Sequence, residues 1–209
     1  MKLVVTAGPT REPIDPVRFL SNRSSGRMGY ALAAAAGARG HQVVLVSGPT
    51  CLEPPAGARF IAVETALDMR DAVHGSLAGA DAVIMCAAVA DYRPASYSPG
   101  KLKKSDAVLA AIPLVENPDI LADLGHARRD YLLVGFAAES GDLEANARAK
   151  LQTKQCDLIV ANSVGGEDSV LDSETTEVRV FFRDGRAQRI GRADKRAVAA
   201  RLIQIVERL

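Results

Sequence analysis

Residues 5–30 read VTAGPTREPIDPVRFLSNRSSGRMGY, a stretch that leaves an apolar strand at Lys2–Ala7 and enters a helix through Ser24–Gly26. A strand, a connection and a helix N-terminus form a corner that favours anions, because backbone N–H groups and the helix dipole point toward it. The connection is long, and it carries several side chains that can reach a phosphate or a carboxylate: Arg11, Arg18, Asn22 and Arg23. The stretch therefore predicts an anion-binding corner at the end of the first strand.

Short apolar runs alternate with helical patterns along most of the chain. The runs are rich in Val, Ile and Leu at consecutive positions, as expected of parallel strands covered on both faces: Leu3–Ala7, Gln42–Ser47, Ala82–Cys86, Tyr131–Phe136 and Leu158–Ala161. The helical patterns between them are Gly29–Ala38, Ala66–Leu77, Pro118–Leu124 and Leu143–Thr153. This alternation predicts an α/β fold, a Rossmann-like doubly wound and mostly parallel sheet that binds ligands at the carboxyl ends of its strands.

The pattern changes toward the C-terminus. Thr176–Phe182 and Ala187–Ile190 flank an Asp184–Gly185 turn and predict an antiparallel hairpin, and Lys195–Leu209 predicts a closing helix. We expect this hairpin to form an appendage at about residues 170–191. With 209 residues the chain has room for one domain, so we expect residues 1–209 to form a single domain.

Composition argues against several classes of protein. Lys and Arg number 26 against 25 Asp and Glu, which leaves a net charge of +1, so no global field recruits nucleic acid or an anionic membrane. No apolar run reaches the roughly 18 residues of a membrane-spanning helix, and the N-terminus opens into a strand rather than a signal peptide. Cys51, Cys86 and Cys156 are widely separated, which argues against a disulfide framework and predicts small buried side chains. We expect a cytoplasmic protein.

Chemically useful side chains follow the predicted strands. The segment Cys86–Tyr92 is rich in small residues, which let a ligand approach the backbone closely. Asn117–Asp119 predicts a helix start with Asn117 as its cap. Lys150 and Lys154 lie one helical turn apart, where they can hold a polyphosphate, although a solvated lysine face is the alternative. The segment Tyr92–Lys104 predicts a loop that carries cations.

Two better-known motifs fit this chain poorly. Tyr97 and Lys101 satisfy the Tyr-x-x-x-Lys dyad of short-chain dehydrogenases, but the Ser98–Gly100 segment between them, with its central proline, makes a poor helix interior. The glycines near the first helix do not form a compact GxGxxG, and the absence of GxxxxGK[ST] excludes a P-loop. An NAD(P)-dependent oxidoreductase built on this fold remains the alternative function.

Longer motifs resemble those of phosphopantothenate–cysteine ligases over essentially the whole chain. They occur in the order and near-spacing of that family: TAGPTREPIDPVRFLSNRSSGRMG, CAAVADYRPA followed by KLKK, NPDI, VGFAAE, the paired Lys150 and Lys154, and DLIVAN. Motifs of this length do not coincide by chance. Arg27 stands where a lysine is common and Pro9 where a second glycine is common, and neither departure removes a functional group.

The resemblance implies a two-step ligation in coenzyme A biosynthesis. The carboxylate of 4′-phosphopantothenate would attack the α-phosphate of CTP with loss of pyrophosphate, and the amine of L-cysteine would then displace CMP from the acyl cytidylate. Mg²⁺ is implied with the triphosphate, held largely by phosphate oxygens and water. The family also implies a homodimer, in which we expect the C-terminal hairpin to serve as a dimerisation element. In bacteria it further implies a phosphopantothenoylcysteine decarboxylase that is fused or separate. Eukaryotic relatives use ATP, so CTP is inferred from the bacterial style of the motifs.

The resemblance also implies roles for single residues. Asn22 and Lys101 are implied as catalytic, because Asn22 can hold an acyl-phosphate oxygen and Lys101 can neutralise charge at the α-phosphate. The phosphopantothenate site is implied at Asn22, Ala87, Ala88 and Asp91, with Arg18 from the neighbouring subunit. The nucleotide site is implied at Met85, Cys86, Ala87, Asp91, Lys101, Asn117, Pro118, Asp119, Ile120, Phe136, Lys150 and Lys154. Phe136 would offer an apolar face to the base, and Lys150 and Lys154 would meet the outer phosphates.

Overall fold

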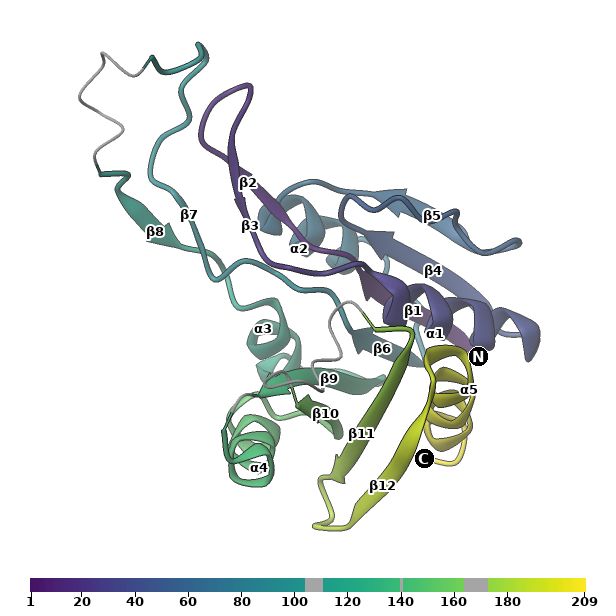
Figure 1. Ribbon diagram of the computed structural model, residues 1–209. Coiled ribbons are helices and arrows are strands. Elements are labelled where there is room, and N and C mark those ends of the chain that lie inside the picture. Colours follow the sequence, from purple (N-terminus) through teal and green to yellow (C-terminus); the bar gives the residue numbers. More distant parts are fainter. Residues whose placement is uncertain (104–110, 140, 164–172) are drawn as a thin grey trace.

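An eight-stranded sheet forms the centre of the molecule (Figure 1). The computed structural model describes residues 1–103, 111–139, 141–163 and 173–209. The strands of the sheet are β1 (Lys2–Ala7), β4 (Gln42–Ser47), β5 (Arg59–Ala62), β6 (Ala82–Met85), β9 (Leu132–Glu139), β10 (Leu158–Ser163), β11 (Thr175–Phe182) and β12 (Ala187–Asp194). Their spatial order is β12–β11–β10–β9–β6–β1–β4–β5.

The strands from β5 to β10 pair in parallel. Their order, β5–β4–β1–β6–β9–β10, is that of a doubly wound sheet, in which the direction of winding reverses between β1 and β6. Ligands of such sheets bind at the carboxyl ends of the strands, beside this switch point. The predicted Rossmann-like, mostly parallel fold is confirmed.

Helices cover both faces of the sheet. One face carries α1 (Arg27–Ala38) and α5 (Lys195–Val206), and the other carries α2 (Ala66–His74), α3 (Ile120–His126) and α4 (Leu143–Thr153). Leu32 and Leu202 belong to the core of the first face, and Met69 and Leu124 to that of the second. Because both faces are buried, strands such as β1 are apolar at consecutive rather than alternate positions, which is the pattern that predicted them.

The predicted C-terminal hairpin is present and continues the main sheet. β11 pairs antiparallel with β10 and with β12, and Asp184–Gly185 forms the connecting turn with a φ of 91° at Gly185. The second strand is longer than predicted and runs directly into α5. Residues 170–172, where we expected the appendage to begin, lie outside the described residues.

Two small hairpins form an arm that projects from the carboxyl edge of the sheet (Figure 1). They are the antiparallel pairs β2 (Arg11–Pro13) with β3 (Phe19–Ser21) and β7 (Tyr92–Pro94) with β8 (Leu114–Glu116). The first hairpin packs against β7. The prediction of plain loops here was wrong, because strands of three residues are too short to show an alternating pattern. Lys104 of the predicted loop lies outside the described residues.

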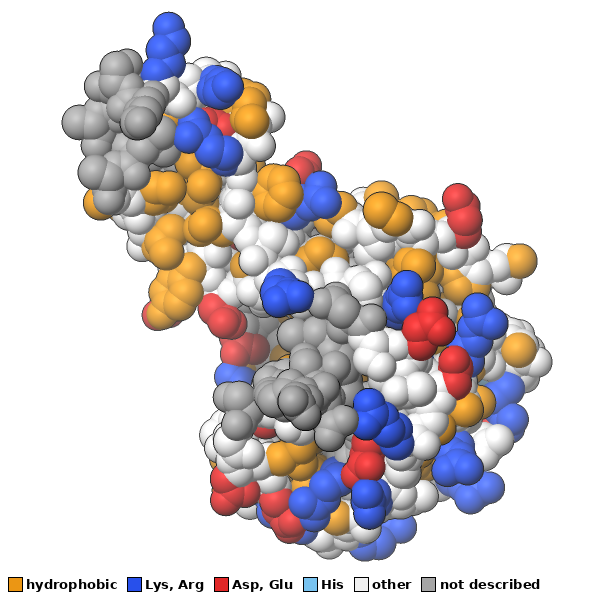
Figure 2. All heavy atoms as spheres, in the orientation of Figure 1, with side chains coloured by type: hydrophobic (Ala, Val, Ile, Leu, Met, Phe, Trp, Pro, Cys, Tyr) orange, Lys and Arg blue, Asp and Glu red, His pale blue; other side chains and the backbone are white. Residues whose placement is uncertain are grey.

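Hydrophobic side chains gather on the surface of the arm (Figure 2). The exposed ones are Val17, Phe19, Tyr92, Tyr97, Leu114 and Val115. A contiguous apolar surface of this kind marks a site of contact with another molecule more often than a free surface.

The structure differs from the sequence analysis in two smaller respects. The edge strand Arg59–Ala62 was not predicted, because it is short and mostly exposed and so lacks the apolar run of a central strand. Cys51 is exposed rather than buried, whereas Cys86 is half-buried and Cys156 is buried. All three cysteines are free, and burial raises the pKa of the Cys156 thiol to about 12.

Candidate active site

Hydrogen bonds from two buried threonines fix the loop that follows β6. The hydroxyl of Thr6 accepts from the backbone N–H groups of Cys86 and Ala87, at 3.0 and 3.1 Å. The hydroxyl of Thr10 accepts from the N–H of Ala90 at 3.0 Å. Both threonines are fully buried, and a buried hydroxyl that satisfies backbone donors determines the path of the segment it holds. The threonines therefore position the loop that carries the predicted substrate residues.

The loops after β1 and β6 also bond each other through their backbones. The N–H of Ala88 donates to the carbonyl of Gly8 at 2.9 Å, and the N–H of Thr10 donates to the carbonyl of Ala88 at 3.3 Å. Gly8 has a φ of 71°, and a Cβ there would lie 2.9 Å from the carbonyl oxygen of Gly48. Only glycine fits this turn. The switch point between β1 and β6 is thus a closely packed junction of two loops.

The N-terminus of α1 opens onto the same edge. Its N-cap is Gly26, with a φ of 74° and no side-chain capping bond. The first N–H groups of the helix are therefore left to other acceptors, and the helix dipole adds positive potential there. A Cβ at Gly26 would lie 2.7 Å from a methyl group of Thr50, so the turn requires glycine. This geometry fits the anion-binding corner predicted from Ser24–Gly26.

Two predicted substrate residues lie at the foot of the arm. Asn22 follows β3 and donates from Nδ2 to the carbonyl of Val89 at 2.9 Å. Asp91 precedes β7, and its carbonyl accepts from the N–H of Asn117 at 2.8 Å. Both side chains are exposed. The structure therefore brings the predicted phosphopantothenate residues of one subunit to adjoining loops at the switch point: Asn22, Ala87, Ala88 and Asp91.

The predicted cap of α3 was wrong. The N-cap is Asp119, whose Oδ1 accepts from the N–H of Ala122 at 2.9 Å. Asn117 donates from Nδ2 to the carbonyl of Ala90 at 2.8 Å and accepts at Oδ1 from Arg93 at 3.0 Å. The amide of Asn117 is thus used to join the start of α3 to the loop after β6, and the carboxylate two residues later caps the helix. Pro118, between them, is half-buried.

The paired lysines reach this edge from α4. Nζ of Lys154 lies 2.5 Å from Oδ2 of Asp119, and Nζ of Lys150 donates to the carbonyl of Phe136 at 3.1 Å. Burial raises the pKa of Asp119, but the bonds from Lys154 and from the N–H of Ala122 outweigh burial and hold that pKa below its usual value. Predicted nucleotide residues from α3, α4 and β9 therefore meet beside the strand ends.

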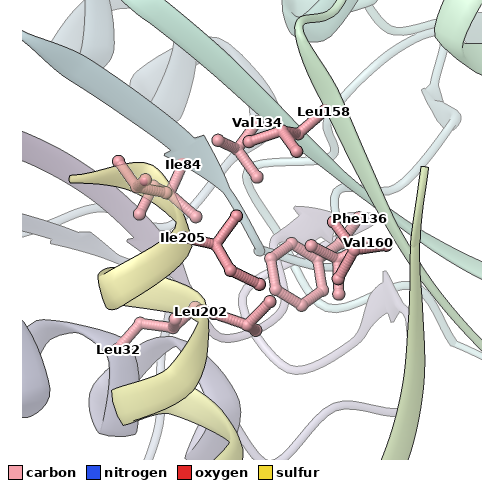
Figure 3. Close-up of a pocket in the computed structure, with 10 residues that line it drawn as sticks. Leu32, Ile84, Val134, Phe136, Leu158, Val160, Leu202 and Ile205 are labelled. Atoms are coloured by element: carbon pink, nitrogen blue, oxygen red, sulfur yellow. The ribbon is translucent and has the colours of Figure 1, made fainter. Parts of the chain in front are cut away.

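Phe136 faces away from the lysines. Its half-buried ring packs with the core on the α1 and α5 face, whereas α4 covers the opposite face. The ring lines an internal apolar cavity of about 10 Å³ together with residues such as Val160 and Leu202 (Figure 3). An apolar contact between Phe136 and a base would therefore use only the part of the ring that the core leaves uncovered.

Three further predicted nucleotide residues offer little side-chain surface. Met85 and Ile120 are buried, so they can contribute through their backbones. Cys86 is half-buried and lies next to the core of the α1 and α5 face. Burial raises the pKa of the Cys86 thiol to about 12, which keeps it protonated at neutral pH and excludes it as a nucleophilic thiolate.

Arg18 and Lys101 lie on the arm, away from the switch-point loops. Arg18 donates from Nε to Oδ2 of Asp15 at 3.0 Å and from Nη2 to the carbonyl of Leu102 at 2.7 Å. The neighbouring Lys101 has an exposed side chain. Strand β3 separates Arg18 from Asn22, and four residues of extended chain span roughly 13 Å. The structure therefore does not bring Arg18 and Lys101 to the group formed by the other predicted residues.

Sequence reasoning missed several residues that shape the site: Thr6, Thr10, Asp15 and Arg93. Thr6 lies inside an apolar strand and gives no signal there, because buried threonines are common in strands. Asp15 was not singled out as a functional residue, although its spacing from Arg18 allows the ion pair that forms, in which Nε and Nη2 of Arg18 both donate to Oδ2 of Asp15.

The described part of the chain lacks two further kinds of feature. It holds no cluster of three or more His, Cys, Asp or Glu side chains that could bind a metal ion. Within the same residues, every helix is too short or too polar to cross a membrane.

Known proteins match the chain over nearly its full length. The family model of the DNA/pantothenate metabolism flavoprotein C-terminal domain matches residues 1–209. The coenzyme A biosynthesis bifunctional protein CoaBC of Bacillus subtilis (strain 168) is 45% identical over 208 residues, which cover 99% of this chain and 51% of that protein. CoaBC of Escherichia coli (strain K12) is 46% identical over 189 residues, 88% of this chain and 46% of that protein. The chain spans about half the length of these curated relatives.

Solved structures agree with the fold. The crystal structure of the C-terminal domain of the bifunctional protein CoaBC superposes with a TM-score of 0.85 at 40% identity, and the match covers 99% of this chain and 94% of that one. A Cab2 H337A mutant in complex with phosphopantothenate-cysteine has a TM-score of 0.78 at 15% identity, covering 99% and 85%, and shows the fold alone. The chain therefore belongs to the family of the DNA/pantothenate metabolism flavoprotein C-terminal domain.

Proposed function

We propose that the chain is a phosphopantothenate–cysteine ligase, which forms the amide between 4′-phosphopantothenate and L-cysteine in coenzyme A biosynthesis. The observation that carries this proposal is the meeting of Asn22, Ala87, Ala88 and Asp91 on adjoining loops at the β1/β6 switch point. The names of the relatives support it, because both are coenzyme A biosynthesis bifunctional proteins. We infer a cytoplasmic enzyme that works with a phosphopantothenoylcysteine decarboxylase, fused or separate.

The surroundings suit a nucleoside triphosphate, and we propose CTP as the co-substrate. Lys150 and Lys154 supply cations beside the strand ends, and the uncapped N-terminus of α1 supplies backbone donors. Mg²⁺ would arrive with the triphosphate. Since the described residues offer no protein cage for a metal, phosphate oxygens and water would be its main ligands.

The chemistry follows from the need to activate a carboxylate. A carboxylate oxygen of 4′-phosphopantothenate attacks the α-phosphate of CTP, the bond to the β-phosphate breaks, and pyrophosphate leaves. The amine of cysteine then attacks the acyl carbon, loses a proton and expels CMP. Asn22 can donate from Nδ2 to an acyl-phosphate oxygen, and Lys101 can neutralise charge that develops at the α-phosphate. The remaining residues hold the two substrates in reacting geometry.

We propose that the arm contacts a second copy of the chain. Val17, Phe19, Tyr92 and Tyr97 are all 45% exposed or more and give the arm an apolar surface that a partner would cover. The described part of the C-terminal hairpin carries no large exposed hydrophobic side chain, which favours the arm over that hairpin as the dimer contact. In such a dimer Arg18 would reach the phosphopantothenate pocket of the partner.

Pyrophosphate release tests the ligase directly. We expect release that requires 4′-phosphopantothenate and a nucleotide, faster with CTP than with ATP when both are run side by side, and lost on removal of Mg²⁺. Lys101→Gln and Asn22→Asp should abolish turnover and keep the circular dichroism spectrum and Tm. The exposed Arg201 on α5 offers a control, and Arg201→Gln should keep full activity. Nucleotide turnover that does not depend on 4′-phosphopantothenate would refute the proposal.

The oxidoreductase alternative is favoured only by the strand order, which is shared with dinucleotide-binding sheets. In this chain the β2–β3 hairpin separates Gly8 from Gly26, so the first loop is not the compact glycine-rich turn that holds a pyrophosphate. Saturable enhancement of NAD(P)H fluorescence would revive that alternative, and a flat titration would dismiss it.

A further inference from the structure

Asp15 is a buried carboxylate on the arm to which the proposed mechanism gives no role. Its side chain is fully buried at the β2–β3 turn. Oδ1 accepts from the N–H groups of Val17 and Arg18 at 2.9 and 2.8 Å, and Oδ2 accepts from the guanidinium of Arg18 and from the N–H of Leu102 at 3.1 Å. A buried charge is tolerated only when it is paired and hydrogen-bonded, so these contacts account for its stability there.

The contacts of Asp15 reach beyond its own turn. The backbone of Leu102 is held at both ends, because its N–H donates to Asp15 and its carbonyl accepts from Nη2 of Arg18. Nearby, the N–H of Ser98 donates to the carbonyl of Ile14 at 3.0 Å. The segment 98–102 is therefore attached to the β2–β3 turn by three bonds. Lys101, the predicted catalytic cation, lies inside this attached segment.

The same carboxylate orients Arg18. Nε and Nη2 of the guanidinium are both engaged, by Asp15 and by the carbonyl of Leu102. Among the described residues Nη1 meets no acceptor, and the side chain is 36% exposed. The guanidinium is thus held in one plane with its remaining edge available to an anion, and such pre-organisation reduces the entropy lost on binding.

We propose that Asp15 is a positioning residue of the ligase, which holds Arg18 and the backbone beside Lys101 as one unit so that both cations are presented to the anionic substrates of one active site. This inference rests on the proposed function. Arg18 and Lys101 share this attachment. If Arg18 serves the pocket of the partner subunit, Lys101 therefore enters that same pocket.

Amide hydrogen exchange tests the attachment without any assay of activity. We expect Asp15→Asn to speed exchange across residues 98–102, because an amide oxygen is a weaker acceptor than a carboxylate and the Asn amino group faces donors. Asp184→Asn is the matched control, since Asp184 forms the same kind of turn pair with Arg186 in the C-terminal hairpin. Unchanged exchange at 98–102 in a folded Asp15→Asn protein would overturn the inference, whether or not the chain is a ligase.

Kinetics test the consequence for the reaction. With Tm within a few degrees of the parent, Asp15→Asn should lose about 10- to 100-fold in kcat/KM for 4′-phosphopantothenate, and Asp184→Asn should change it by less than about twofold. The loss should overlap with that of Arg18→Gln. The double variant Asp15→Asn/Arg18→Gln should therefore have nearly the same kcat/KM as Arg18→Gln alone. Losses that multiply would mean independent damage and overturn the positioning role.

A second variant covers the case in which Asp15→Asn fails to fold. Arg18→Lys keeps the positive charge and the buried carboxylate but cannot bond Asp15 and Leu102 through two nitrogens. It should speed exchange at 98–102 and lower kcat/KM toward the level of Arg18→Gln. Full activity of Arg18→Lys would show that charge alone suffices and would overturn the proposal. An inactive parent protein refutes the ligase instead, while the exchange experiment still decides the attachment.

Discussion

The carboxylate of Asp119 lies 2.5 Å from Nζ of Lys154 while its other oxygen caps α3. Two residues proposed for the nucleotide site thus neutralise each other before any nucleotide binds. A triphosphate at this edge has to compete with Asp119 for Lys154, whereas Lys150 donates to a neutral carbonyl and is the easier cation to recruit. The Asp119–Lys154 pair therefore determines how much Lys154 and Lys150 can each contribute to nucleotide binding.

Lys154→Gln should weaken CTP binding by about tenfold, since a bond to a charged group is worth roughly 1.5–3 kcal/mol and part of it is offset by release of Asp119. Lys150→Gln should weaken binding more. Titration calorimetry at two salt concentrations measures both, with Arg201→Gln as the control that keeps affinity. A tighter complex with Lys154→Gln would show that Lys154 serves only to pair Asp119.

Thr6→Val should destabilise the protein by about 1–3 kcal/mol and lower activity, because the N–H groups of Cys86 and Ala87 lose their buried acceptor. Thr6→Ser keeps the hydroxyl and is the matched control. Its loss of stability should be smaller, because only the methyl group is removed. Urea unfolding and pyrophosphate release measure the two effects. Equal stability of the Val and Ser variants would contradict the role of this hydroxyl.

Gly125→Ala should cost about 1–3 kcal/mol, because a Cβ there would lie 1.8 Å from the carbonyl oxygen of Lys154 and would push α3 away from the end of α4. The same shift would separate Asp119 from Lys154, so CTP affinity should change as well. Gly37→Ala in α1 is the control, since nothing lies within 4 Å of its Cβ. Thermal unfolding should show a lower Tm for the first variant and an equal or higher one for the second.

Acid should break the ion pair between Arg39, at the end of α1, and Glu207, at the end of α5. The guanidinium of Arg39 bonds both oxygens of Glu207 and lowers the pKa of that carboxyl to about 2 from 4.5. Because the folded-state pKa is depressed, the stabilisation is complete above about pH 4.5 and is lost as the pH falls toward about 2. Glu207→Gln should lower Tm by about 2 °C at pH 7. The gap between parent and variant should close between pH 4.5 and 2, and a gap that persists at pH 2 would contradict this origin.

The central sheet could be predicted because burial on both faces gives consecutive apolar residues, as in β1 and β4. The arm could not. Its strands have three residues each, and the pairing of Tyr92–Pro94 with Leu114–Glu116 joins segments across a long stretch of sequence. Local pattern carries no information about such a pairing.

The candidate site was predicted through family motifs rather than through geometry. Those motifs named Asn22, Asp91 and Asn117, which the fold brings to neighbouring loops. They did not identify Thr6 or Asp15, whose contribution is to accept hydrogen bonds from backbone far away in the sequence. Such residues look ordinary in a sequence, because their partners are defined only once the chain has folded.

Mixed dimers test whether Arg18 and Asn22 act in different active sites. They lie at opposite ends of β3, so one subunit is not expected to present both to the same pocket. If Arg18 serves the partner's pocket, a dimer of one Arg18→Gln subunit and one Asn22→Asp subunit contains one site with both residues intact. Co-expressed, differently tagged subunits should then recover about half of the parent activity per mixed dimer, while each homodimer stays inactive.

Because Lys101 is attached to the same turn as Arg18, pairing Lys101→Gln with Asn22→Asp should give the same recovery, whereas pairing Lys101→Gln with Arg18→Gln should give none. Recovery in the Lys101 and Arg18 pair would place the two cations in different sites and would contradict their common attachment through Asp15.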